Sequence, residues 1–383
     1  MATIIDDLSR TFNEYLLLPG LTRKEHGPDN VRLTAALARY KRDTEPRAQL
    51  NLPLVSAAMQ SVSGSELAIA LARQGGASFI YCSQPIDEQA AMVRRVKEHK
   101  AGFVRSDSNL SPSATLADAV KLRGETGHST IAITEDGTSK SKLLGLLTSK
   151  DFWEFKDDLS HSVVEHYTPL DKLVYAEEGV SLQEATEKLW RSKKECLPVV
   201  DKEGNLHSLV FRRDYFDHKS NPDELTDSQK RLFVGAALNT FDYRERSKAL
   251  YEAGVDCFCL DSSDGFSEWQ RDAVHDLKKE FGGDVIVGAG NVVDATGFRY
   301  LVEKASADFV KIGVGGGSIC TTREQKGIGR GQASALMEVA AERDKYFKET
   351  GYYVPICSDG AVDNDTHITV SYTHLRAHET RYD

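Results

Sequence analysis

The sequence lacks several features that would assign it to a class at once. No stretch reaches the ~18 consecutive apolar residues of a membrane-spanning helix, and the first ten residues, MATIIDDLSR, do not resemble a secretory signal. No Gly-x-Gly-x-x-Gly motif follows the first predicted strand, so a Rossmann dinucleotide site is not expected there. Basic residues are also in the minority. The formal net charge of −10 over 383 residues argues against nonspecific nucleic-acid binding.

Cysteine is sparse, and its spacing is irregular. The six cysteines are Cys82, Cys196, Cys257, Cys259, Cys320 and Cys357. This pattern resembles neither a disulfide framework nor a zinc site. We therefore expect a reducing, intracellular compartment. Most of these cysteines are expected to be small buried side chains, and Cys320 differs because a glycine-rich loop precedes it.

Short apolar runs alternate with amphipathic segments along much of the chain. The predicted strands are 53–59, 77–82, 233–239, 257–263, 285–291, 309–315 and 352–357. The predicted helices are 64–74, 87–100, 243–253, 268–281, 295–304 and 332–350. This alternation predicts an α/β protein with a parallel sheet. Polar or glycine-rich residues follow five of the strands, which favours a (β/α)8 barrel over a doubly wound sheet.

The most informative stretch is residues 311–332, KIGVGGGSICTTREQKGIGRGQ. An apolar run leads into four glycines, then Ser318 and Cys320, and a second Gly/Arg loop follows. Glycines allow the backbone to approach a ligand closely and to turn its polar groups inward. A cysteine beside such a loop is a candidate nucleophile, because nearby dipoles favour the thiolate.

This stretch resembles the catalytic loop of the IMP dehydrogenase/GMP reductase family, and the resemblance runs from about Thr11 to about Thr369. It implies a TIM-barrel oxidoreductase that oxidises IMP to XMP with NAD, in GMP biosynthesis, through a covalent cysteine adduct. It also implies a homotetramer. A cytoplasmic location is expected, with a peroxisome-type C-terminal signal as the alternative.

The resemblance also assigns roles to individual residues. Cys320 is implied as the nucleophile and Thr322 as the group that assists proton transfer, while Arg323 is either a nearby cation or an ordinary surface arginine. The implied substrate contacts are Met59, Asn291, Ser318, Asp359 and Gly360. The implied cofactor contacts are Asp261, Ser262, Ser263, Gly313 and Gly315. A potassium ion is implied on the backbone carbonyls of Gly315, Gly317 and Cys320. Ala361 departs from the family pattern, which has a second glycine there, and its methyl group would hinder backbone approach to the substrate phosphate.

Residues 102–218 differ from the rest of the chain because they contain an internal repeat with an offset of about 66 residues. Leu116-x-x-Ala119 matches Leu182-x-x-Ala185, and Ile131-Ala132-Ile133 matches Leu197-Pro198-Val199. The repeat resembles a tandem CBS (Bateman) module, which implies binding of adenine or guanine nucleotides. The positions implied for ribose and phosphate contacts are Thr148, Asp151, Arg212 and Asp214. The alternative is a structural spacer whose Asp and Thr side chains are ordinary helix caps.

We expect four segments. Residues 1–101 and 219–369 form the barrel, 102–218 form the insert, and 370–383, VSYTHLRAHETRYD, are interpreted as a non-native tail of a truncated chain. Only seven barrel strands are predicted, so the eighth would be missing. The family's mobile flap, whose arginine activates water, would also lie beyond Thr369, so the chain as given is expected not to complete hydrolysis.

Two other functions stay open at this stage. A GMP reductase would share the barrel and the cysteine but would convert GMP to IMP with NADPH. A noncatalytic nucleotide-sensing protein would use only the CBS pair. The loop 324–332, EQKGIGRGQ, and the insert favour the dehydrogenase, whereas degenerate chemistry elsewhere in the chain would favour the sensor.

Overall fold

The computed structural model describes residues 7–99, 103, 106, 108–212, 221, 223–228 and 231–375. The chain divides into two compact units. Unit 1 comprises Met1–Lys97 and Asp223–Asp383, and unit 2 comprises Glu98–Pro222. The predicted insert, 102–218, lies within unit 2. No helix among the described residues is long and apolar enough to cross a membrane.

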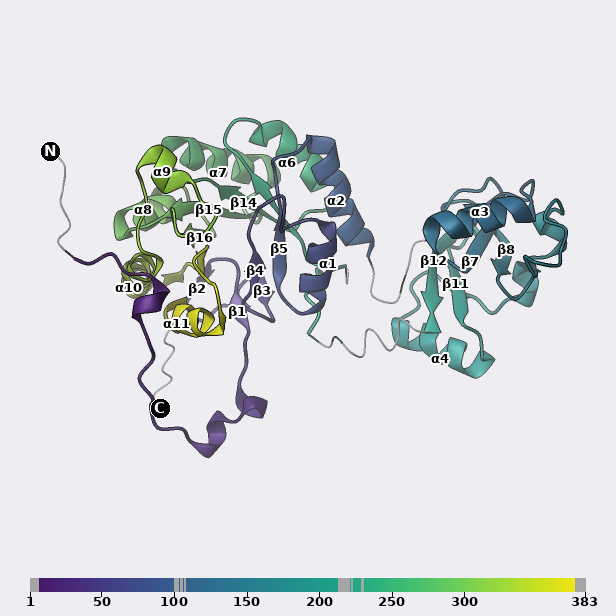
Figure 1. Cartoon of the computed structure of the whole chain (residues 1–383), viewed down its shortest axis with the longest axis horizontal. Coiled ribbons are helices and arrows are strands. Elements are labelled where there is room, and N and C mark those ends of the chain that lie inside the picture. The colour runs from purple at the N-terminus through teal and green to yellow at the C-terminus, as the bar shows by residue number, and fades with distance from the viewer. Residues whose placement is uncertain are drawn as a thin grey trace. The chain divides into compact units, whose positions relative to one another are not determined.

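Unit 1 contains a curled sheet of seven strands, all paired in parallel (Figure 1). Its order is β18-β16-β15-β14-β13-β5-β4. The strands are β4 (Val55–Ser56), β5 (Ala77–Ile80), β13 (Gly235–Leu238), β14 (Cys257–Asp261), β15 (Ile286–Val292), β16 (Phe309–Ile312) and β18 (Ile356–Ser358). The predicted α/β class with a parallel sheet is confirmed, and each strand lies within or next to a predicted apolar run.

Helices connect these strands and cover the outside of the sheet (Figure 1). They are α1 (Ser65–Arg73), α2 (Ile86–Glu98), α6 (Tyr243–Glu252), α7 (Glu268–Phe281), α8 (Ala295–Arg299) with the π-helical turn η6 (Tyr300–Lys304), α9 (Thr322–Lys326), α10 (Gln332–Thr350) and α11 (Asp365–Leu375). Local sequence fixes several helix ends. Ser267 caps α7 by accepting a hydrogen bond from Gln270 N, and Gly351 ends α10 in the left-handed conformation.

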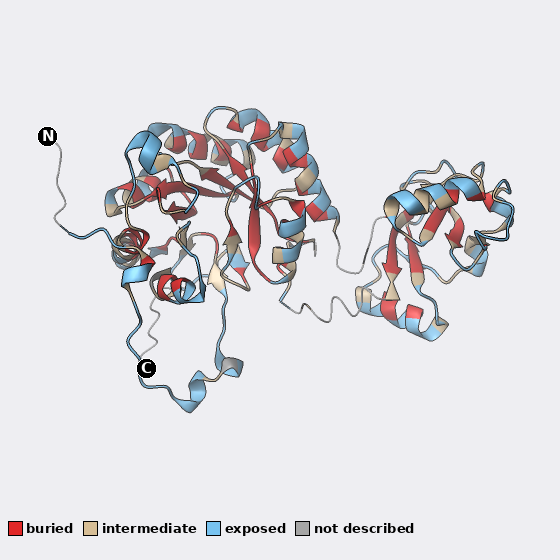
Figure 2. Ribbon diagram, in the orientation of Figure 1, coloured by how far each residue is buried: buried red, intermediate tan, exposed pale blue. Residues whose placement is uncertain are grey.

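The strands are buried on both faces, as Figure 2 shows for the sheet of unit 1. Alternate residues of β14 therefore enter two different cores. Phe258 and Leu260 pack with the helices, whereas Cys257 and Cys259 pack inside the curl. A side chain at Gly288 would lie 2.0 Å from the Phe309 ring, so glycine is required for this inner packing.

The last predicted strand, 352–357, is two strands in the structure. Tyr352–Tyr353 form β17, which pairs with β2 (Tyr40–Lys41), and only Ile356–Ser358 join the main sheet. Pro355 lies between them, and proline has no N–H to donate to a ladder. A second small pair joins β1 (Ala35–Ala36) to β3 (Gln49–Leu50).

The predicted tail begins inside helix α11. Val370 is 3% exposed and joins the outer core of unit 1. Arg343 donates a hydrogen bond of 2.6 Å to the Leu375 carbonyl. At the other end of the chain, Phe12 in the turn η1 (Phe12–Glu14) is buried, and Asn13 contacts His367 of α11. Residues 376–383 lie outside the described residues.

Unit 2 contains the same short fold twice. The first copy is β6 (Asn109–Leu110), α3 (Leu116–Thr126), β7 (Thr130–Thr134) and β8 (Leu143–Thr148). The second is β10 (Ala176–Glu177), α4 (Leu182–Ser192), β11 (Cys196–Val200) and β12 (Leu206–Phe211). In each copy the first strand is parallel to the second and the last is antiparallel to it. Both helices also begin with a capping box. The predicted duplication is therefore present, while its identity as a CBS pair stays a prediction.

Candidate active site

The Cys320 loop connects β16 to α9 at the carboxyl end of the sheet. Its glycines are required by their surroundings. Gly313 and Gly315 have φ values of +133° and +76°, which favour glycine. A Cβ atom at Gly313 would lie 2.3 Å from the Asp359 carbonyl, and one at Gly315 would lie 2.5 Å from Cγ of Arg323. Both glycines thus allow the loop to lie close against neighbouring segments.

Within this loop the Cys320 thiol is placed to ionise. The backbone N–H of Cys320 donates a hydrogen bond to the Gly317 carbonyl at 3.1 Å, and this bond closes a tight turn. Hydrogen bonds from the Thr322 side chain and backbone lower the pKa of Cys320, and the Gly315 backbone and the Arg323 charge act in the same direction. By contrast, burial raises the pKa of Cys357 to about 12. Cys320 is therefore the thiol best suited to nucleophilic attack.

We expect Thr322→Val to raise the pKa of Cys320, because the variant loses the hydroxyl that stabilises the thiolate. The rate of Cys320 alkylation by iodoacetamide rises with pH as the thiol ionises, so the midpoint of this profile should move to higher pH. Thr322→Ser retains the hydroxyl and should keep the original midpoint. An unchanged profile in Thr322→Val would show that the hydroxyl does not support the thiolate.

A buried lysine joins two of the predicted ligand-binding carboxylates. Lys311, in β16, lies 2.8 Å from Asp261 at the end of β14 and 2.9 Å from Asp359 after β18. Asn291, in β15, donates to Asp359 at 2.8 Å and to the Gly313 carbonyl at 2.7 Å. Because the strands are parallel, their carboxyl ends bring these four side chains together.

The charges within this cluster stabilise one another. Burial lowers the pKa of Lys311, but the Asp359 and Asp261 carboxylates outweigh burial and hold it well above the usual value. Burial also raises the pKa of Asp359, and the Lys311 charge and the Asn291 amide more than offset this, so that it lies below its usual value. Lys311 is not among the predicted site residues, although a lysine inside the apolar run FVKI is a signal of a special role.

A cavity of about 190 Å³ lies next to this cluster. It is lined by Ser263, Phe266, Asn291 and Val314, among others. Lys326, in α9, donates to Ser263 at 2.8 Å and forms an ion pair with Asp264 at 2.6 Å. The segment after Cys320 is thereby tied to the loop after β14. Two of the predicted contact residues, Ser263 and Asn291, line the cavity.

The remaining predicted contacts lie around the same edge of the sheet. Ser318 is exposed in the Cys320 loop. Ser262 follows β14, and its backbone bonds to Gly290 and Asn291 of β15. Met59 follows β4, at the other end of the strand order, and is 38% exposed. Of the unit 2 positions, Thr148 donates its hydroxyl to Asp151 at 2.8 Å. Asp214 lies outside the described residues.

The strand-end turn at Gly360 and Ala361 faces the glycine loop. Both residues have left-handed backbones, with φ values of +83° and +57°. Glycine tolerates this conformation, but the Ala361 methyl makes it unfavourable. A Cβ atom at Gly316 would lie 3.3 Å from the Ala361 methyl. The methyl group therefore occupies the side of the turn that faces the loop.

Ala361→Gly is expected to raise the free energy of unfolding by about 0.5–1 kcal/mol. The backbone strain that is removed with the left-handed alanine is larger, as a free energy, than the stability lost because glycine gives the unfolded chain more conformational entropy. Urea denaturation would measure this change. Ala253→Gly is a suitable control, because Ala253 has an ordinary helical φ of −73° and should lose stability. A loss of stability in Ala361→Gly would contradict the strain argument.

Comparison with known proteins decides which family the chain belongs to. Residues 9–374 match the IMP dehydrogenase / GMP reductase domain. The chain belongs to the IMP dehydrogenase/GMP reductase family. This match spans both units, and it accords with the curled parallel sheet and the strand-end position of the Cys320 loop.

Named relatives of this family are similar over nearly the whole chain. Inosine-5'-monophosphate dehydrogenase of Tritrichomonas foetus is 51% identical over 371 residues, covering 97% of this chain and 74% of that protein. The enzyme of the same name from Schizosaccharomyces pombe is 37% identical, covering 96% and 68%. A GMP reductase structure from Trypanosoma brucei, in complex with guanosine 5'-triphosphate, aligns with a TM-score of 0.82 at 30% identity, covering 96% and 84%.

Proposed function

We propose that the chain carries the catalytic residues for the NAD-dependent oxidation of IMP to XMP, a step of guanine nucleotide synthesis. The observation that carries this proposal is the Cys320 thiol, whose pKa is lowered by Thr322 in a glycine loop beside the buried Asp261–Lys311–Asp359 cluster. Relatives named inosine-5'-monophosphate dehydrogenase, among them one that is 51% identical over 371 residues, support the choice of substrate.

The proposed chemistry uses Cys320 as a nucleophile. Its thiolate adds to C2 of the purine, forming a carbon–sulfur bond, and C2 then loses its hydrogen with both electrons. This leaves a purine thioimidate on Cys320. Water adds to C2, the carbon–sulfur bond breaks with return of the thiolate, and XMP leaves. The Thr322 hydroxyl, which hydrogen-bonds to Cys320, is proposed to take part in moving the proton of that water.

The residues around the loop offer suitable groups for the rest of the nucleotide. The Asp359 carboxylate would accept hydrogen bonds from the ribose hydroxyls, and Ser318 with the Gly360 turn would contact the phosphate. Met59 would pack on the base. The buried Asn291 Oδ1 has no hydrogen-bond partner among the described residues, so it offers an acceptor to the purine or the cofactor.

The dinucleotide would bind beside this site. Asp261, Ser262 and Ser263 are the proposed contacts, and the cavity lined by Ser263 and Phe266 has room for the nicotinamide end rather than the whole molecule. Bound NAD would supply the hydride acceptor. Gly313 and Gly315 would help indirectly, since they keep the loop close to Asp359 and Arg323.

A potassium site on the carbonyls of Gly315, Gly317 and Cys320 is also proposed. Carbonyl oxygens are donors that suit such a hard cation. The Gly317 carbonyl already accepts from Cys320 N, and its second lone pair would be the one offered to the ion. The ion would steady the turn that carries the nucleophile.

Unit 2 is proposed to be a tandem CBS module that binds adenine or guanine nucleotides. Two observations support this: the duplicated fold, and a related GMP reductase whose structure was determined in complex with guanosine 5'-triphosphate. A homotetramer and a cytoplasmic location are proposed from family resemblance and from cysteine usage.

GMP reductase activity is the second candidate, because the structural match to two Trypanosoma brucei GMP reductases is extensive, with TM-scores of 0.78 and 0.82. Their identity to this chain is 29% and 30%, against 51% for the dehydrogenase relative. The higher identity over nearly the whole chain favours the dehydrogenase.

Parallel incubations of the purified chain distinguish the two functions. We expect NADH to form from IMP and NAD in a potassium buffer. In a single-turnover experiment, NADH formation should be recorded as an initial burst. Release of ammonia from GMP with NADPH would identify a reductase instead. A chain that binds nucleotides and shows neither reaction would favour the noncatalytic sensor.

A further inference from the structure

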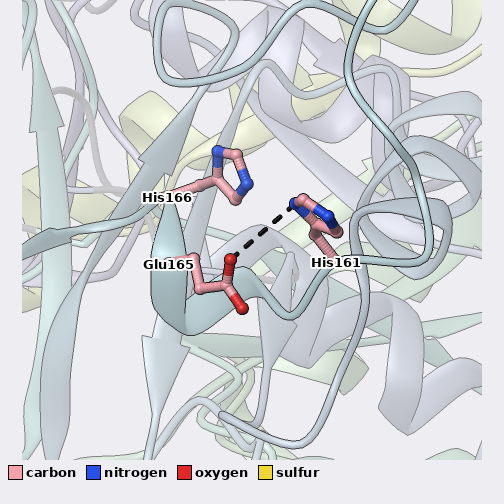
Figure 3. A group of neighbouring side chains, drawn as sticks. All are labelled: His161, Glu165 and His166. Carbon is pink, nitrogen blue, oxygen red and sulfur yellow. Dashed lines mark ion pairs between the residues drawn. The ribbon is translucent and has the colours of Figure 1, made fainter.

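One turn of unit 2 brings together two imidazoles and a carboxylate that the proposed reaction does not use. They belong to His161, Glu165 and His166, and one potential ligand atom from each lies within 4.8 Å of the others. Figure 3 shows the three side chains turned toward one another around the short helix η4 (Val163–Glu165). The turn allows a sequence of only six residues, HSVVEH, to supply all three groups.

The backbone that carries these groups is held at several points. The His161 carbonyl accepts from Leu116 N at 2.9 Å, and Val163 N donates to the Ala114 carbonyl at 3.0 Å. The Val163 side chain is fully buried in the core formed with α3. On the far side, Thr168 enters strand β9 (Thr168–Pro169), which pairs with β8. A fixed backbone lowers the entropy that ligand side chains lose when they bind an ion.

The spacing of the donor atoms is close to that of a metal site. His161 Nδ1 lies 3.7 Å from a Glu165 carboxylate oxygen, and the edge of a zinc tetrahedron with ~2.1 Å bonds is about 3.4 Å. The two imidazole rings have centroids 6.0 Å apart. His166 Nε2 is buried and has no hydrogen-bond partner among the described residues. A buried ring nitrogen without a hydrogen-bond partner is unfavourable unless a ligand or a metal ion binds to it.

We propose that His161, Glu165 and His166 bind a divalent transition-metal ion, with Zn²⁺ as the physiological candidate. Two imidazoles and one carboxylate are the donor set that suits Zn²⁺ and Co²⁺, and they disfavour Ca²⁺ and Mg²⁺, which prefer oxygen ligands. Water would complete the coordination. The ion would hold together the turn between β8 and β9 that carries all three ligands.

The competing explanation is an ordinary surface ion pair between His161 and Glu165, whose side chains are 50% and 63% exposed. Unit 2 offers a matched control for it. His207 and Glu178 form a similar pair, 3.4 Å apart, and the metal-ligand geometry found at His161 does not include them. His207→Gln therefore removes a histidine–carboxylate pair from the same unit without affecting the proposed site.

The test is titration of the full chain, freed of metal by a chelator, with Co²⁺ followed by visible absorption. Imidazole and carboxylate ligands give ligand-field bands without the intense charge-transfer band of a cobalt–thiolate site, so the six cysteines are distinguished from the proposed ligands. We expect one Co²⁺ per chain without a thiolate band, and Zn²⁺ should displace it. His161→Gln and Glu165→Gln should each weaken binding by at least about tenfold, since loss of even indirect ligand support costs this much.

Circular dichroism of the metal-free variants checks their fold, which should be unchanged because His161 and Glu165 are exposed. His207→Gln should bind Co²⁺ as the unaltered chain does. The proposal is overturned if no Co²⁺ binds, if the spectrum shows thiolate ligation that survives His161→Gln, or if His207→Gln weakens binding as much as the proposed ligand variants do.

Discussion

Lys311→Met is expected to lower the free energy of unfolding of unit 1 by about 3–5 kcal/mol, because it removes one partner from a buried charge cluster. The Lys311 side chain is 3% exposed and lies within 3 Å of both Asp261 and Asp359. Methionine fills similar space but leaves two carboxylates near each other without a cation. Urea denaturation near neutral pH, followed by fluorescence, would measure the change.

Lys326→Met is the matched control. Lys326 also forms a short ion pair, 2.6 Å from Asp264, but its side chain is 48% exposed. Solvent screens such a pair, so its loss should cost less than about 1 kcal/mol. If Lys311→Met were no more destabilising than Lys326→Met, the buried cluster would not be a stabilising element of the fold.

The pH dependence of this effect follows from the two shifted pKa values. Folding lowers the pKa of Asp359. Its contribution to the free energy of unfolding is therefore present above the pKa of the unfolded chain, about 3.9, and is lost as pH falls through the folded pKa. Folding raises the pKa of Lys311. Its contribution to the free energy of unfolding is therefore fully present below the pKa of the unfolded chain, about 10.4, and is lost as pH rises through the folded pKa. The difference between Lys311→Met and the unaltered chain should therefore be largest between about pH 4 and about pH 10 and should narrow in acid.

The sequence was most informative where local pattern and tertiary environment agree. The apolar run at Cys257–Asp261 predicts a strand, and the sheet divides its side chains between two cores by simple alternation. The position of Cys320 after glycines likewise predicts a candidate nucleophile beside a loop, and the structure has this residue half-buried in a tight turn. Both depend on neighbouring residues of the chain, and such information is present in the sequence itself.

Features that depend on distant partners were not predicted. Lys311 lies 50 residues from Asp261 and 48 from Asp359 in the sequence (311 − 261 and 359 − 311), and only the strand order β18-β16-β15-β14 of the folded sheet brings them together. The division of the last predicted strand depends in the same way on the pairing of Tyr352–Tyr353 with β2. The cluster of His161, Glu165 and His166 was missed for a different reason. The three residues are close in sequence, but only the conformation of the turn that contains η4 brings their side chains together.

The identity of the reactive thiol gives the largest expected effect on activity. Cys320→Ala should reduce the single-turnover rate of NADH formation from IMP and NAD by on the order of 10⁴-fold or more, since removal of a catalytic nucleophile has effects of this size. Intact mass spectrometry should show a purine adduct on the unaltered chain after acid quenching and none on the variant. IMP binding, measured by calorimetry, should change much less.

Cys196→Ala is the control, because Cys196 lies in β11 of unit 2, which is not one of the strands of the seven-stranded sheet. It should retain the NADH burst and the adduct. Burial raises the pKa of Cys257 and Cys259 well above the usual range, so neither should replace Cys320 as a nucleophile. An adduct on any cysteine other than Cys320, or a burst that persists in Cys320→Ala, would contradict the proposed mechanism. Loss of the adduct with retained IMP binding would place the defect in the chemical step, where the lowered pKa of Cys320 has its effect.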